Sequence, residues 1–90
     1  IAILAIIDIG TEYFRNLVSS DTVVENALVA KRCNYAGVIL SCKHPERIRR
    51  VRESVGKDFQ IFSTLESGCR HGDGFSSGAD YEIVSEKFFS

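Results

Sequence analysis

The chain has 90 residues, of which 44% are hydrophobic and 26% charged, and its formal net charge is -1. This length allows one small domain with a modest core. The balanced charge argues against a general polyanion binder, which carries a large basic excess, so we expect no nucleic-acid partner. The longest apolar run, residues 1–7, is too short to cross a bilayer and lacks the features of a signal peptide. We therefore expect no membrane partner and a cytoplasmic location.

The first half of the chain alternates between strand and helix patterns. Residues 1–10, IAILAIIDIG, form an apolar run closed by Gly10, which is typical of a strand buried on both faces. A short helix is predicted over residues 12–18. A second helix is predicted to start at a capping box over residues 22–25 and to end near Asn34. Its expected buried residues are Val24, Ala27 and Leu28.

The next segment, AGVILSCKHPERIRRVRESVGKDFQIFS, predicts a strand, a helix and a further strand. The strands span residues 37–41 and 59–63. Pro45 suits the first turn of the helix, and Gly56 stands where a left-handed C-terminal cap is needed. The apolar face of this helix comprises Ile48, Val51 and Val55. The arginines around it are predicted to form a solvated outer face: Arg47, Arg49, Arg50 and Arg52.

The last part of the chain is less regular. Residues 64–80 contain four glycines, too many for a stable helix, and we assign them no element. Residues 81–85, YEIVS, predict a fourth strand. Hydrophobic strands separated by helical crossovers imply a parallel α/β sheet with right-handed connections. Such a sheet has two unpaired edges and one uncovered face, so we expect the chain to associate with a partner.

Several motifs in the second half resemble the C-terminal half of orotidine 5'-monophosphate decarboxylase, a (β/α)8 barrel, especially the archaeal type. The family's Pro-Glu-Arg-(Ile/Leu) helix start is matched by residues 45–48, and its Arg-Glu-x-Val-Gly helix end by residues 52–56. A strand ending in serine is matched at Ser63, and a Gly-Ala-Asp-Tyr-x-Ile-Val run at residues 78–84. The resemblance implies that the chain is a half-barrel holding strands five to eight.

The ligand-binding positions depart from the family pattern. The family's phosphate loop after strand seven, Pro-Gly-(Ile/Val)-Gly-Ala-Gln-Gly-Gly-Asp, reads TLESGCRHGDG here, and the phosphate-binding arginine after strand eight is replaced by Glu86. A glutamate at that position repels a phosphate dianion. The family's Lys/Asp catalytic network lies in the first half of the barrel, to which no part of this chain corresponds. These departures lie at the C-terminal ends of the strands, where this fold places its active site.

Two functional hypotheses follow. In the first, the chain is half of a decarboxylase-like lyase of pyrimidine biosynthesis, or of a related sugar-phosphate lyase, and supplies only substrate contacts once a second half completes the barrel. In the second, it is a truncated, diverged or engineered half-barrel that folds and self-associates without catalysis. Both hypotheses expect a homo-oligomer or pairing with an N-terminal half-barrel. The resemblance implies decarboxylation without a cofactor, and we predict none, although a related hexulose-phosphate synthase uses a magnesium ion.

The candidate site residues all follow predicted strands, and a nucleotide or a sugar phosphate is the ligand class they would suit. No catalytic residue is identified. The candidate substrate- or phosphate-binding residues are Asp8, Gly10, Ser63, Thr64, Arg70, His71, Gly72 and Ser85. For Asp8 a turn residue is the alternative interpretation. Arg70 and His71, beside Gly72 and Gly74, suggest a replacement anion cradle built from converging backbone N–H groups, with a mobile loop as the alternative.

The cysteines and histidines allow a second kind of site. The chain has three cysteines with no Cys-x-x-Cys spacing, and reduced intracellular thiols are the simplest interpretation. Cys42, His44, Cys69 and His71 follow neighbouring strands, which would allow a metal site. Their spacing is not a standard zinc pattern, so we predict no metal.

Overall fold

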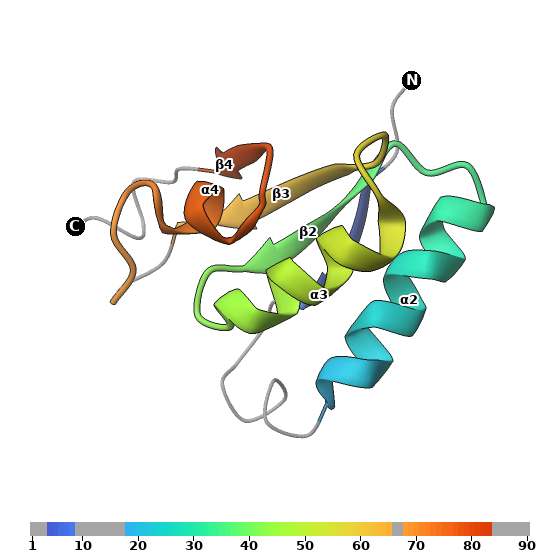
Figure 1. Ribbon diagram of the computed structural model, residues 1–90, viewed down its shortest axis with the longest axis horizontal. Helices are drawn as coiled ribbons and strands as arrows, with labels where there is room; N and C mark the ends of the chain where they lie inside the picture. Colours follow the sequence, from blue (N-terminus) through green and yellow to red (C-terminus); the bar gives the residue numbers. More distant parts are fainter. Residues whose placement is uncertain (1–3, 9–17, 66–67, 84–90) are drawn as a thin grey trace.

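The computed structural model describes residues 4–8, 18–65 and 68–83, and within them strands alternate with helices. The elements are β1 (Leu4–Asp8), α2 (Ser20–Arg32), β2 (Gly37–Ser41), α3 (Pro45–Val55), β3 (Gln60–Thr64), α4 (Asp73–Ser77) and β4 (Tyr81–Ile83). The described strands form one sheet in the order β1-β2-β3-β4, and each neighbouring pair is parallel (Figure 1). The parallel α/β class predicted from the sequence is confirmed.

The helices lie on one side of the sheet, with α2 and α3 side by side (Figure 1). The core fills the space between these helices and the strands. It is built from side chains of both layers: Val23, Ala27, Ala30, Val38, Leu40, Ile48, Val51, Val55, Phe59, Ile61 and Ala79. Because side chains alternate across a strand, Val38, Leu40 and Ile61 face the helices and their neighbours in β2 and β3 face the other way.

Helix α2 starts earlier than its sequence predicts. Ser19, not Thr22, is the N-cap, and its side-chain oxygen accepts the backbone N–H of Thr22 at 3.2 Å. The predicted capping box is therefore wrong, because Ser19 already provides a favourable cap and adds nearly one turn to the helix. Val23 and Ala30 join Ala27 in the buried face. The predicted Val24 and Leu28 are only partly buried at its margin.

Helix α3 follows its prediction at both ends. Pro45 occupies the first turn, and Ile48, Val51 and Val55 are buried. Gly56 has the positive φ expected of it, 80°, although its ψ of -163° lies outside the left-handed helical region. Strand β3 is displaced by one residue from the predicted 59–63 and ends at Thr64.

The arginines of α3 do not form one solvated face, so that prediction is wrong for two of them. Arg47 is 5% exposed, and its guanidinium donates to the backbone oxygen of Val18 at 2.6 Å. Arg52 has a side chain that is 20% exposed and donates to three backbone carbonyls and to Asp80. Arg49 and Arg50 are exposed as predicted. The helical pattern alone does not distinguish the bound arginines from the exposed ones. A long arginine side chain next to the apolar face of a helix can still reach polar partners.

Residues 64–80 contain an element that the glycine content argued against. α4 forms a single short helix over Asp73–Ser77, between left-handed residues Gly72 and Gly78. The glycines limit its length and supply the turns at both its ends. The short helix predicted over residues 12–18 lies almost entirely outside the described residues.

Within residues 18–65 and 68–83, no helix is both long enough and apolar enough to span a membrane.

Candidate functional site

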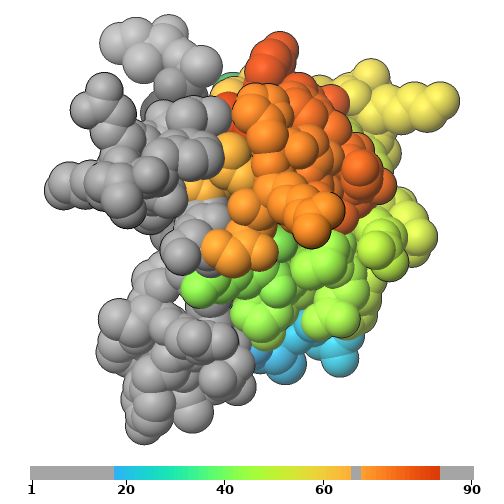
Figure 2. Space-filling model, turned by 90° about the vertical axis from the view of Figure 1, so that its left-hand side faces the viewer, coloured from blue at the N-terminus to red at the C-terminus, as the bar shows by residue number. Residues whose placement is uncertain are grey.

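The candidate site lies where the parallel strands end. The residues after β2 and after β3 meet there, because parallel strands present their C-terminal ends at the same edge of the sheet. Figure 2 looks onto this edge and shows the segment around α4 in orange beside the start of α3 in green. Beyond Ile83, the residues that would follow β4 are outside the described part of the chain.

A disulfide joins the two connections at this edge. Cys42, directly after β2, is bonded to Cys69, in the segment between β3 and α4, with a Cα–Cα distance of 6.4 Å. The interpretation of three reduced thiols is therefore wrong, because the parallel strand ends bring these two cysteines together. Cys33 is a free, exposed thiol. Cys42 and Cys69 thus do not supply thiolate ligands in this structure, and the described residues contain no cluster of three metal-ligating side chains.

The cysteine assignment gives a direct prediction. Thiol titration of the unfolded chain without reductant is expected to find one thiol per chain, and titration after reduction is expected to find three. In a Cys33→Ser variant the unreduced chain should show none. Three thiols before reduction would contradict the disulfide.

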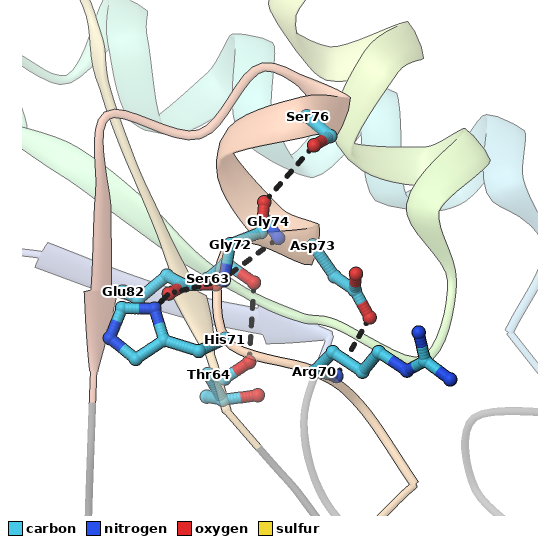
Figure 3. A network of polar contacts seen from close by, with 9 residues as sticks. All are labelled: Ser63, Thr64, Arg70, His71, Gly72, Asp73, Gly74, Ser76 and Glu82. Carbon is cyan, nitrogen blue, oxygen red and sulfur yellow. Dashed lines mark hydrogen bonds and ion pairs between the residues drawn. The ribbon is translucent and has the colours of Figure 1, made fainter.

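The centre of the site is a carboxylate held by backbone N–H groups. The Glu82 side chain is only 2% exposed. The Gly72 N–H donates to both carboxylate oxygens, at 3.0 and 2.9 Å, and the Gly74 N–H donates to one of them at 3.3 Å. Nδ1 of His71 lies 3.1 Å from Oε1 of Glu82. Figure 3 shows this carboxylate between the His71 ring and the start of α4. The arrangement is an anion cradle occupied by the protein's own anion.

Glycine is required at both donor positions for different reasons. Gly72 has a φ of 98°, which side chains other than glycine rarely adopt. Gly74 lies against β3, where an added Cβ would stand 2.5 Å from the Cβ of Ser63. Asp73 holds the loop in shape from between them, because its carboxylate accepts the backbone N–H of Arg70 at 2.8 Å.

The structure brings some of the sequence-predicted residues together. His71 and Gly72 contact the Glu82 carboxylate, and Ser63 lies buried under α4. The Arg70 guanidinium points away from the cradle (Figure 3), and the backbone N–H of this residue is bound by Asp73. Thr64 is 7% exposed at the end of β3.

The remaining candidates contribute little to this geometry. Asp8 ends β1, opposite Leu40 of β2 in the register. Gly10 and Ser85 lie outside the described residues. For all of these residues, ligand binding remains a prediction.

Sequence reasoning missed Glu82, the residue on which the site depends. It stands at the variable position of the Gly-Ala-Asp-Tyr-x-Ile-Val run, so the motif gives no signal for it. The available signal is a charged residue inside a short apolar strand, which predicts a buried and bound carboxylate. The ion pair between Arg52 and Asp80 was also missed, because Asp80 is a fixed position of the same motif and carries no separate signal.

No protein-family model matches the chain, and no curated protein matches it with significant sequence similarity.

Proposed function

We propose that this chain is the C-terminal half of a (β/α)8 barrel of the orotidine 5'-monophosphate decarboxylase type, and that by itself it is a non-catalytic half-barrel. Its role is then to fold and associate rather than to bind a phosphorylated substrate. The motifs at Pro45–Val55 and around Gly78 support the family assignment. The order β1-β2-β3-β4, with helices on one side, suits half of such a barrel.

The observation that carries the non-catalytic part is the occupied cradle. The resemblance puts the substrate's phosphate in the loop after β3, which is the loop that contains Gly72 and Gly74. In this chain their N–H groups are bound to Glu82. A phosphate that entered beside the carboxylate would meet a like charge, and two unit charges 4 Å apart cost about 4 kcal/mol at an effective dielectric constant near 20. A phosphate bound by these N–H groups must therefore displace Glu82 from three hydrogen bonds that two N–H groups donate.

Thermal unfolding in the presence of uridine monophosphate tests this proposal. Ligand at a hundredfold excess over its dissociation constant stabilises a native state by about 2.7 kcal/mol, which is about 10 °C or more in Tm for a domain of this size. We expect no such shift with uridine monophosphate or inorganic phosphate, compared with uridine and with chloride at matched ionic strength.

Activity gives the second readout. The purified chain is expected to convert no orotidine monophosphate to uridine monophosphate. A saturable Tm increase specific to the phosphorylated compounds, or measurable turnover, would favour the enzyme hypothesis and its sugar-phosphate alternative instead.

A further inference from the structure

The sheet face opposite the helices carries a row of apolar side chains. Ile39 of β2 is paired in register with Phe62 of β3, and Phe62 with Tyr81 of β4. Val38, Leu40 and Ile61 face the helices, so the alternation of side chains directs Ile39 and Phe62 to the opposite face. In the backbone register, Ile6 of β1 is next to Ile39.

This row is incompletely covered. Tyr81 is 48% exposed, and Ile39 and Phe62 are half-buried. The rings of Phe62 and Tyr81 stack with centroids 4.8 Å apart, so they present one continuous aromatic surface. Tyr81 is one of the few large hydrophobic residues so exposed in the described chain, and it lies on a sheet rather than at a loop tip. An apolar row of this kind is a candidate interaction surface.

The same sheet has two outer edges. Among the described strands, β1 pairs only with β2 and β4 only with β3, so no described strand lies on the outer side of either. Unpaired edges act as templates for further strands. All four strands run in one direction. A strand added to either edge in the same direction would continue the parallel pattern.

We propose that a second copy of this chain covers this face, and that β4 of each copy pairs in parallel with β1 of the other. This inference rests on the half-barrel proposal and names its partner. A twofold axis along the strand direction keeps all the strands parallel. It also creates two equivalent junctions, in each of which the outer edge of β4 of one copy lies beside the outer edge of β1 of the other. The result is a closed parallel barrel without free edges, in which the two rows of Ile39, Phe62 and Tyr81 face one another.

A second copy is sufficient for closure. One chain supplies both kinds of edge that closure requires, and both copies present the same apolar row. A net charge of -1 per chain gives little repulsion between copies. Antiparallel pairing of two β4 strands would satisfy only one edge of each copy. It would leave both β1 edges open to further association.

A matched pair of substitutions tests the inference. Tyr81 and Phe75 are 48% and 47% exposed, but Tyr81 lies on the sheet face and Phe75 on α4. We expect the unaltered chain to run as a dimer of twice 10.0 kDa by light scattering. Tyr81→Glu is expected to weaken the dimer about a hundredfold or more, because each dimer contains the substitution twice and each removes a buried aromatic contact. Phe75→Glu should leave the dimer unchanged, and circular dichroism checks that both variants fold.

Small-angle scattering of the unaltered chain gives a test that needs no variant. A compact closed dimer of twice 90 residues has an expected radius of gyration of about 16 Å. A dimer joined at one edge would be more elongated, and growth beyond the dimer would show open pairing. Either result overturns the closed arrangement. A chain that stays monomeric from micromolar to millimolar concentrations overturns the second-copy proposal altogether. None of these outcomes affects the half-barrel's expected lack of uridine monophosphate binding, which is measured separately.

Discussion

Replacement of Glu82 by alanine is expected to lower the free energy of unfolding by about 2 kcal/mol, because it removes the acceptor of two N–H groups, of which Gly74 is buried and Gly72 half-buried. The Gly72 and Gly74 N–H groups have the Glu82 carboxylate as their acceptor, and that side chain is 2% exposed. An unsatisfied buried donor costs about 1–3 kcal/mol. Against a total stability of about 5–15 kcal/mol for a small domain, this loss is large. Urea unfolding followed by circular dichroism measures it.

Two further variants separate the bound carboxylate from the loss of a side chain. Glu82→Gln keeps one carbonyl oxygen as an acceptor, but its NH₂ group is a donor and faces the N–H donors of the loop. We therefore expect an intermediate loss of about 1 kcal/mol in the free energy of unfolding. Glu53→Ala removes an exposed glutamate from α3 and should change stability by less than about 0.5 kcal/mol. Equal stabilities of the Glu82→Ala variant and the unaltered chain would contradict the occupied cradle, and with it the main support for the non-catalytic proposal.

The fold was predictable where local signals agree. The strand at Gly37–Ser41 and the helix at Pro45–Val55 were predicted with the observed bounds. In these segments the apolar pattern, the proline start and the glycine stop indicate the same boundaries. The start of α2 was not predictable from the capping box alone. Ser19 and Thr22 are both favourable N-cap residues, and Glu25, three residues after Thr22, pointed to the later start.

The site was less predictable, because its residues come together only through the tertiary structure. Cys42 and Cys69 are separated by 27 residues, and a count of three cysteines does not reveal which ones meet. The glycines at 72 and 74 correctly suggested converging N–H groups. The anion that they bind comes from β4, ten residues from Gly72 along the chain, and no local pattern connects the two.

The same limit applies to the arginines of α3. Periodicity places Arg49 and Arg52 outside the apolar stripe, and both were predicted to be solvated. Only Arg52 stands near the carbonyls that end α3 and α4. The structure therefore assigns to one arginine a role that its neighbour of identical chemistry does not have, and this makes Arg49 a suitable control.

Replacement of Arg52 by alanine is expected to lower the free energy of unfolding by about 3 kcal/mol. Its guanidinium donates to the backbone oxygens of Gly78, Gly56 and Phe59 at 2.9, 2.7 and 2.8 Å. It also donates to Oδ2 of Asp80 at 2.5 Å. Hydrogen bonds to charged groups contribute about 1.5–3 kcal/mol each and are not additive within one side chain. Arg52→Lys is expected to lose most of this, because an ammonium group lacks the planar fork. Arg49→Ala should lie within about 0.5 kcal/mol of the unaltered chain.

A double-mutant cycle with Asp80→Ala identifies which partners matter. Asp80 Oδ2 also accepts the backbone N–H of Ile61 at 2.9 Å, so the aspartate fixes the start of β3 independently of Arg52. If Arg52 acted only through this carboxylate, its replacement in the Asp80→Ala background would cost nothing further. We expect it still to cost about 2 kcal/mol, because the carbonyls of Gly56, Phe59 and Gly78 would lose their donor. Arg52 would then be the link that joins the end of α3 to the starts of β3 and β4, and the ion pair only a part of that link.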